Sequence, residues 1–399
     1  MEILIETLGP RTRVAILENK RLMEIYYEDP QRILGNIYKG IVRDILPGIN
    51  ATFVDVGKGQ NLFLSFKELT DAQLKGHRRG ATIQKILKGG QQLIIQVKRE
   101  AIGSKNPQGT LKISLPGRYW VFLPTDERLG ASRRIADERE SRRLKRIARK
   151  LKKAGEGLIA RTAAQGASEE DLERDFNYLL GTWKGIEEKA QRTSAPALLY
   201  RGPDLVKAIL RDRLLENVER VLVDSNEVHQ EILDFLRYMH MDGYIDLVQL
   251  YRGKRPLFEV HGVESQLRES LQPKVKLPGG GYLVIAETEA LTAIDVNTGS
   301  DVKHQNQETA ILNTNLEAAV EIPRQLRLRK LSGIIIADFV DMKRRDHLEK
   351  VIRKLQEELK KDRVPADFVD ITKLGLVEIT RKREGESLLG LLEEESNGG

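Results

Sequence analysis

The chain has 399 residues, of which 40% are hydrophobic and 31% are charged, and it contains no cysteine. This composition predicts a globular protein of several domains, and the lack of cysteine excludes disulfides, thiol catalysis and cysteine-ligated zinc or iron–sulfur centres. No apolar run approaches the roughly 18 residues needed to span a bilayer, and the N-terminus lacks the pattern of a signal peptide, so we expect a cytoplasmic protein.

The net charge of +7 is concentrated in one segment. Residues 128–153 contain 12 basic residues and three acidic ones, and Leu144, Ile147, Ala148 and Leu151 recur at helical spacing among them. The spacing predicts an amphipathic helix with a basic outer face. Such a patch favours a polyanionic partner, most simply nucleic acid, although a solvated helix face explains the charges equally well.

The N-terminal strands predicted at residues 2–7, 13–18 and 21–27 are too few to form a domain alone. Residues 206–271 alternate predicted helices and strands, so we expect this later segment to complete the fold of residues 1–34. The residues between the two segments are then an insertion.

Residues 35–116 are predicted to form a five-stranded barrel of the OB-fold type, whose exposed sheet face commonly binds single-stranded nucleic acid. Phe53 and Phe63 are candidate rings for base stacking, although aromatic residues in strands are more often part of a core. The predicted strands are 37–45, 51–56, 62–65, 93–98 and 112–115.

Residues 117–205 contain the basic helix, a strand at 157–161 and a second helix that Ser168 is expected to cap. The strand ends in Arg161 and Thr162. A guanidinium beside a hydroxyl can bind a terminal phosphate, whereas an ion pair of Arg161 at the surface is the simpler alternative.

Residues 272–399 alternate strands with two helices, at 308–329 and 347–361, and predict an α/β layer. In two of these strands a short apolar run leads directly into an aspartate, Asp295 in one and Asp338 in the other. Burying an ionised carboxylate costs free energy unless a cation or hydrogen bonds offset it, so we interpret the two strand ends as one metal site. Ile334 and Ile336 are expected to form a buried row that leads to Asp338.

The oxygen atoms of Asp295, Asn297 and Asp338 suit a hard ion such as Mg²⁺ or Mn²⁺, the arrangement used to hydrolyse phosphodiesters. Asp295 and Asn297 are two residues apart on one strand and therefore point to the same face. The alternative is that each aspartate caps a helix or closes a turn, and Asp341 is interpreted as such a turn residue.

Eight segments along the chain resemble the catalytic half of the RNase E/G family of endoribonucleases, and they occur in the same order as in that family. The resemblance implies an α/β multidomain fold. An RNase H-like domain (1–34 and 206–271) is split by an OB-fold domain (35–116) and a 5′-sensor domain (117–205), and a DNase I-like catalytic domain (272–399) follows. The segments are residues 36–40, 51–55, 132–135, 157–162, 290–297, 313–318, 324–329 and 338–342.

The resemblance implies magnesium-dependent hydrolysis of single-stranded, A/U-rich RNA in RNA processing and mRNA decay, leaving 5′-phosphate and 3′-hydroxyl ends. It makes Asp295 and Asp338 the Mg²⁺ ligands, with Asn297 assisting, and makes Phe53, Phe63 and Lys105 RNA contacts. The residues that it implies for a 5′-monophosphate pocket are Arg161, Thr162, Gly117, Val121, Arg133 and Lys373, the last standing where the family has arginine.

The chain departs from the family after Arg383, where well-known members place a Cys-x-x-Cys zinc link and a small domain. Because cysteine is absent, no zinc is expected, and a homo-oligomer would have to form without that link. Two other functions remain open at this point: a non-catalytic RNA-binding or assembly protein, and a deoxyribonuclease.

Overall fold

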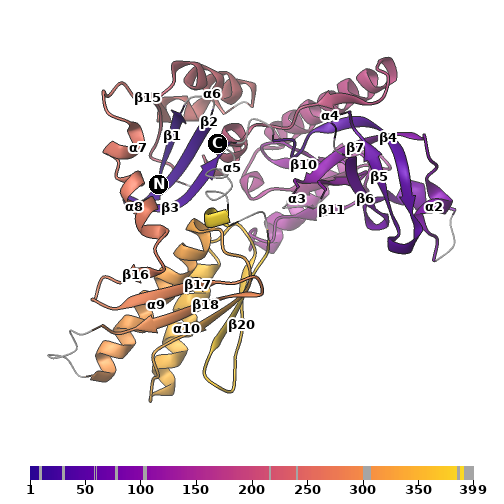
Figure 1. The fold of residues 1–399 in the computed structure, drawn as a ribbon. Coiled ribbons are helices and arrows are strands. Elements are labelled where there is room, and N and C mark those ends of the chain that lie inside the picture. The colour runs from indigo at the N-terminus through magenta and orange to yellow at the C-terminus, as the bar shows by residue number, and fades with distance from the viewer. Residues whose placement is uncertain are drawn as a thin grey trace. The chain divides into compact units, whose positions relative to one another are not determined.

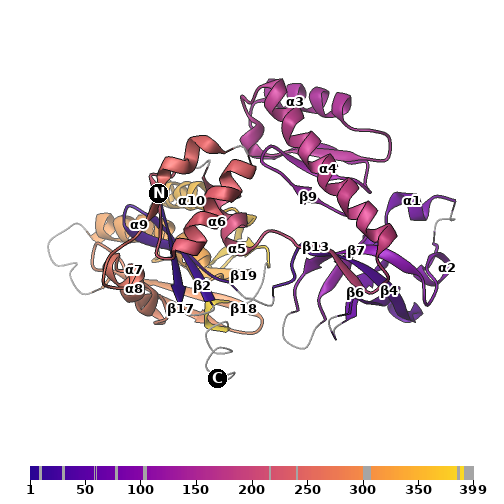
Figure 2. The same cartoon turned by 90° about the horizontal axis from the view of Figure 1, so that it is seen from above.

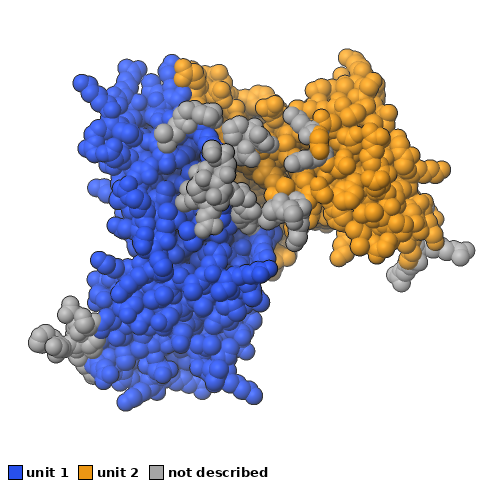
Figure 3. All heavy atoms as spheres, in the orientation of Figure 1, with its two compact units in different colours: residues 1–27, 219–226, 249–399 blue, residues 28–218, 227–248 orange. Residues whose placement is uncertain are grey.

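The computed structural model describes residues 1–8, 11–28, 32–57, 59, 61–76, 80–101, 106–214, 217–239, 241–299, 307–383 and 387–390. The chain forms two compact units (Figure 3). Unit 1 comprises Met1–Tyr27, Glu219–Asn226 and Gln249–Gly399, and unit 2 comprises Glu28–Val218 and Glu227–Val248. Each unit contains mixed α/β structure (Figure 1).

The first sheet of unit 1 joins the N-terminal strands to a later segment, in the order β15-β14-β1-β2-β3. β1 pairs in parallel with β14, with Ile3 opposite Val221, so the N-terminal strands are completed from later in the chain as the sequence predicts. The strands are β1 (Glu2–Leu8), β2 (Arg11–Glu18), β3 (Arg21–Tyr27), β14 (Arg220–Val223) and β15 (Val248–Leu250), and α7 (Leu257–Val260) and α8 (Val263–Ser270) contribute to the same core.

The second sheet of unit 1 has the order β16-β17-β18-β19-β21-β20, in which only β18 and β19 pair in parallel. Two helices, side by side in Figure 1, cover one face and bury Ile294, Ile335 and Ile379 beneath them. The elements are β16 (Lys274–Lys276), β17 (Tyr282–Glu287), β18 (Leu291–Asn297), β19 (Gly333–Asp338), β20 (Ala366–Ile371), β21 (Val377–Arg381), α9 (Gln307–Leu328) and α10 (Arg345–Leu359).

Unit 2 contains a closed barrel of five strands, because β4 pairs with both β5 and β7. Alternate side chains such as Val54, Leu62 and Leu64 fill its core, which confirms a barrel of the OB type. Its strands are β4 (Ile37–Leu46), β5 (Ala51–Asp55), β6 (Asn61–Ser65), β8 (Gln108–Thr110) and β7 (Gln92–Arg99), with β13 (Ala197–Tyr200) added beside β4, and its short helices are α1 (Asp71–Leu74) and α2 (Ile83–Ile86).

The strand predicted at 112–115 is wrong. β8 lies earlier, at Gln108–Thr110, where it pairs with β7. The backbone amides of Lys112 and Ile113 donate instead to the side-chain oxygens of Thr110 and Thr125, so residues 112–114 form no strand, and Leu115 begins a strand of another sheet.

Unit 2 also contains a small sheet of order β11-β12-β10-β9, and α3 and α4 are seen beside it in Figure 2. Trp120 is fully buried in their common core and donates from Nε1 to the carbonyl of Leu172 at 2.9 Å. Ser168 caps α4 by accepting from the amide of Asp171, as predicted. The elements are β9 (Leu115–Pro116), β10 (Trp120–Leu123), β11 (Leu129–Ala131), β12 (Gly157–Ala160), α3 (Glu138–Leu151), α4 (Glu169–Arg192), α5 (Leu205–Arg213) and α6 (Asn226–Tyr238).

The assignments of the RNase H-like and DNase I-like domains, and the four domain boundaries, stay predictions. Within the described part of the chain, no helix combines the length and apolar character needed to cross a membrane.

Candidate functional site

Strand pairing brings the two predicted metal ligands side by side. β18 and β19 run parallel, and their register places Asp295 directly opposite Asp338. Neighbouring strands lie about 4.8 Å apart, and directly paired residues point to the same face. Asn297 donates from Nδ2 to Oδ2 of Asp295 at 2.8 Å, so the carboxamide and both carboxylates belong to one cluster.

The expectation that these carboxylates are buried is wrong. Asp295 and Asp338 are exposed, and the buried residues of β19 and the segment after it are Ile335, Ala337 and Phe339. Ile334 is 54% exposed and shares the open face with Asp338. The run in β19 is apolar at every position, so it lacked the alternation that shows which face turns toward the helices. The site is therefore an open sheet face, and no buried charge needs to be offset.

The donor set fits a hard divalent ion. Two carboxylates and a carboxamide supply oxygen atoms, and Mg²⁺ is usually held by one or two carboxylates while it keeps several waters. Across the described ranges, no three or more His, Asp or Glu side chains are grouped so as to hold a metal. Water or substrate would therefore complete the coordination around Asp295 and Asp338, which stay predicted ligands.

The same open face presents further polar groups that the sequence interpretation missed. Tyr282 on β17 pairs with Asn297, and the ammonium of Lys274 lies 3.6 Å from the centre of the Tyr282 ring. Glu378 on β21 pairs with Ile336, two positions before Asp338. Polar and apolar residues alternate within β16, β17 and β21, and this pattern could have indicated these groups. It becomes useful only once the strand order is known.

Asn315 holds the segment that follows Asp338 from the buried side. Its side chain is fully buried in α9, donates to the carbonyl of Val340 at 2.8 Å and accepts from the amide of Val340 at 3.1 Å. Both polar ends of the carboxamide are satisfied by one residue of the backbone. Asn315 therefore fixes the path of the chain as it leaves the strand end that carries Asp338.

Arg161 lies at the end of β12 and is already engaged by protein groups. Its Nη1 donates to the carbonyl of Gly117 at 2.6 Å, and its Nη2 forms an ion pair with Asp212, which directly follows Arg211 in α5. The ion pair that the sequence left as the simpler alternative is therefore present. Gly117 is required because an added Cβ would lie 2.7 Å from the carboxylate oxygens of Asp175.

Asp175 organises the turn on which Gly117 stands. Its carboxylate accepts from the amides of Arg118, Tyr119 and Trp120 at 2.9 to 3.0 Å. Burial raises the pKa of Asp175, and the three amide hydrogen bonds and the charge of Arg161 oppose that rise without cancelling it.

The other residues predicted for the phosphate pocket divide between the two units. The hydroxyls of Thr162 and Ser132 lie 3.0 Å apart, which places Arg133 next to this contact, and Val121 pairs with Ile159 just before the end of β12. Lys373 lies in unit 1, exposed in the turn between β20 and β21. The structure thus gathers Arg161, Thr162, Gly117, Val121 and Arg133 around one strand end, and the role of all six residues stays a prediction.

The two aromatic residues of the barrel lie outside its core. Phe53 and Phe63 are a cross-strand pair on β5 and β6, with ring centres 5.9 Å apart in an edge-to-face arrangement. Both are half-buried, whereas their strand neighbours point inward. Their contact with RNA stays a prediction, and Lys105 lies outside the described residues.

The basic segment forms α3, which buries Leu144, Ile147 and Ala148. Some of its arginines pair with acids of the same helix, as Arg143 does with Glu140 at 2.8 Å. Arg149, Lys150 and Lys153 are exposed and form no ion pair with a described residue. The outer face of α3 therefore keeps its positive charge.

Comparison with known proteins identifies the class. Residues 114–384 match the sequence model of the Ribonuclease E/G family. Ribonuclease G of Haemophilus influenzae is 39% identical over 396 residues, which cover 97% of this chain and 80% of that protein. Ribonuclease G of Escherichia coli (strain K12) is 38% identical over 395 residues, covering 97% and 81%. Ribonuclease E of Nostoc sp. (strain PCC 7120) is 39% identical over 381 residues, covering 94% and 55%.

The chain therefore belongs to the Ribonuclease E/G family, which confirms the family predicted from the eight segments. As a member of this endoribonuclease family, it is an enzyme that hydrolyses RNA.

Proposed function

We propose that this enzyme is a magnesium-dependent endoribonuclease that cleaves single-stranded, A/U-rich RNA in RNA processing and mRNA decay. The observation that supports this most directly is the register that sets Asp295 opposite Asp338, with Asn297 bonded to Asp295. A protein that only binds RNA has no need of two carboxylates directed to one point on an exposed face.

Asp295 and Asp338 would hold the ion, and Asn297 orients the carboxylate of Asp295 through its Nδ2 donor. When bound, Mg²⁺ supplies polarisation of the scissile phosphate and a water of lowered pKa. The open sheet face admits a single strand, and Lys274 and Tyr282 lie beside Asn297, where a cation and a ring suit a phosphate and a base. The products are a 5′-phosphate and a 3′-hydroxyl.

Recognition of a 5′-monophosphate is the second part of the proposal. Gly117 and Asp212 orient the guanidinium of Arg161, and the hydroxyl of Thr162 lies at the same strand end, where Arg133 would supply a second guanidinium. Lys373 and Val121 are assigned to this pocket through the family resemblance. Phe53, Phe63 and Lys105 are proposed to contact the strand further along, and any oligomer is expected to form without a zinc link.

A cleavage assay tests the metal site. An end-labelled, single-stranded A/U-rich oligonucleotide is incubated with the enzyme and Mg²⁺, with EDTA in place of Mg²⁺, and with Asp338→Asn and Asp341→Asn enzymes. We expect EDTA to stop cleavage and Asp338→Asn to slow it more than about 100-fold. Removing a metal ligand should cost more activity than removing a residue that only orients a ligand. Asp341→Asn, an exposed aspartate three residues away, is the matched control and should cleave like the parent.

Cleavage by the parent in EDTA at the rate seen with Mg²⁺ would contradict the metal assignment. The same sequence offered as DNA separates a ribonuclease from a deoxyribonuclease, since contacts to the 2′-hydroxyl distinguish the two substrates.

A further inference from the structure

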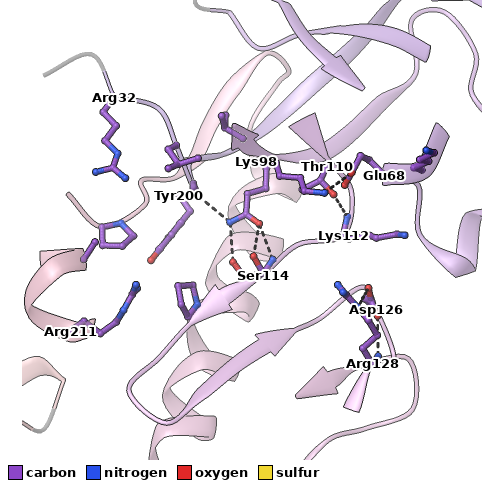
Figure 4. Close-up of a pocket in the computed structure, with 18 of the residues that line it drawn as sticks. Arg32, Glu68, Lys98, Thr110, Lys112, Ser114, Asp126, Arg128, Tyr200 and Arg211 are labelled. Carbon is purple, nitrogen blue, oxygen red and sulfur yellow. Dashed lines mark hydrogen bonds and ion pairs between the residues drawn. The ribbon is translucent and has the colours of Figure 1, made fainter. Parts of the chain in front are cut away.

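Unit 2 contains a cleft of about 620 Å³ that belongs to neither of the proposed RNA sites (Figure 4). Its walls come from the barrel, the small sheet, the segment before β4 and α5, and its volume is within the range of ligand-binding pockets. None of the residues assigned above to RNA or to the 5′-phosphate lines it. The basic residues that line it are Arg32, Lys67, Lys98, Lys112, Arg128 and Arg211, and the acidic ones are Glu68, Asp71 and Asp126.

Two of the acids in the cleft are neutralised by cations of its own wall. Lys98 Nζ lies 2.5 Å from Glu68 Oε1, and Arg128 Nε lies 2.8 Å from Asp126 Oδ2. Burial acts to raise the pKa of Glu68, but hydrogen bonds from Lys98 and Thr110 and the charges of Lys98 and Lys112 lower it overall. Glu68 is therefore ionised, and its nearest partner is Lys98.

Positive charge remains after these pairs are formed. Arg32, Lys67 and Lys112 form no ion pair with any residue in the described ranges, while Asp71 is the single lining acid for which the same holds. A half-enclosed cleft focuses the field of such cations and favours an anionic ligand.

One end of the cleft offers an aromatic group, the ring of Tyr200. Figure 4 shows Tyr200 with Arg32 and Arg211 at one end and Lys98 with Lys112 at the other. Burial raises the pKa of Tyr200, so its hydroxyl stays protonated and is able to donate. Between the ends, the Gln96 amide donates to the carbonyls of Gly35 and Ser114, so it forms a fixed wall.

The cleft is linked to the strand end that carries Arg161. Arg211 lines the cleft and donates from Nε to Oδ1 of Asp212 at 2.8 Å, the same carboxylate that pairs with Arg161. Pro116, which also lines the cleft, directly precedes Gly117, whose carbonyl accepts from Arg161.

We propose that this cleft binds nucleotides through their phosphates, with Lys112 and Arg32 as the cations at its two ends and Tyr200 beside a base. The inference rests on the proposed RNA-cleaving function: the ligand is a segment of the RNA strand that lies next to the 5′-terminal phosphate. A free nucleotide presents the same phosphate and base, so the experiment separates the two sources.

Binding is measured with the full chain carrying Asp338→Asn, in EDTA, so that the result does not depend on cleavage or on the metal. The probe is a fluorescent single-stranded RNA decamer with a 5′-monophosphate, followed by anisotropy at several salt concentrations. Lys112→Glu and the exposed Lys67→Glu test the cleft, and Lys85→Glu, an exposed lysine of α2 that does not line it, is the matched charge reversal.

We expect Lys112→Glu and Lys67→Glu to weaken RNA binding several-fold and to reduce the salt slope by about 0.7 for each phosphate that the variant no longer neutralises. Lys85→Glu should keep both parental values. Equal effects of all three substitutions would overturn the proposal, provided that melting curves show that the variants are folded. If Lys112→Glu does not fold, Lys67→Glu still tests the cleft, because it changes an exposed side chain.

A second arm measures binding of AMP by equilibrium dialysis. Weaker RNA binding without any effect on AMP supports the strand as the source, and weaker AMP binding by Lys112→Glu supports a free nucleotide. No difference from Lys85→Glu in either arm overturns the proposal. Failure of the Mg²⁺ cleavage assay with these binding differences intact would instead contradict the proposed function.

Discussion

At the open sheet face, the carboxylate of Asp338 accepts no hydrogen bond and forms no ion pair with a described residue, and the carboxylate of Asp295 accepts a hydrogen bond only from Asn297 among them. At the end of β12, Arg161 is held by Gly117 and Asp212. The first region presents charges that have no strong partner, which suits an ion that must bring its own waters. The second presents a donor whose orientation the protein has already fixed. We expect these similar strand ends to support two kinds of recognition.

The largest expected effect comes from removing a carboxylate of the open sheet face. Asp295→Asn should lower the initial rate of cleavage at saturating Mg²⁺ more than about 100-fold, because one of the two proposed carboxylate ligands is removed. Asp367→Asn changes another exposed strand aspartate of the same sheet and should retain the parental rate. Comparable decreases in the two variants would show that general surface charge, and not a metal ligand, was removed.

The next prediction asks whether the open face is positioned from its buried side. Asn315→Ala leaves the amide and carbonyl of Val340 without their side-chain partner, and should lower the free energy of unfolding by about 2 kcal/mol. Urea unfolding measures this change. Asn313→Ala, at an exposed position of the same helix, is the control and should be nearly neutral. Alanine has the higher helix propensity, so propensity alone cannot destabilise either variant, and an equal loss of stability in both would contradict the role of the Val340 hydrogen bonds.

Strand and helix positions were largely predictable from the sequence, because period and capping residues act locally. The N-terminal strands, β12, the capped start of α4 and the helices of the last 120 or so residues lie close to where the pattern predicts them. The strand predicted at 112–115 failed because the amides of Lys112 and Ile113 donate to two threonine side chains, one of them twelve residues away, instead of to a neighbouring strand.

The candidate site was predictable as a set of residues but not as a surface. Asp295, Asn297 and Asp338 could be selected from their position after apolar runs, yet their exposure depends on which face α9 and α10 cover. Strand order brings Tyr282 beside Asn297, and the packing of α9 brings Asn315 to Val340. The cleft around Lys112 is formed by segments separated by more than 100 residues, a relation that no local period contains.

Substitution of Arg161 is the corresponding test of the end of β12. Arg161→Ala should lower the preference for 5′-phosphorylated over 5′-hydroxyl RNA by about tenfold, the usual value of a charge-assisted hydrogen bond, while Mg²⁺ dependence is unchanged. Arg161→Lys keeps the charge but removes the fork, so we expect an intermediate ratio. Arg192→Ala, an exposed arginine at the end of α4, is the control, and an unaltered ratio in Arg161→Ala would remove Arg161 from the pocket.

The smallest expected effect concerns α3, where charge acts without a fixed partner. Arg149→Glu with Lys150→Glu should weaken RNA binding a few-fold at about 50 mM salt, and the difference should disappear near 1 M, where the Debye length falls to about 3 Å. The matched double reversal, Lys85→Glu with Lys88→Glu, changes the same net charge at exposed positions of the barrel. If α3 is only a solvated face, both double variants will bind RNA equally weakly, since net charge alone then attracts RNA. A larger effect for α3 assigns the attraction to the helix itself. Its decline with salt separates it from the proposed contacts of Arg161, which we expect to persist at salt concentrations that screen exposed charges.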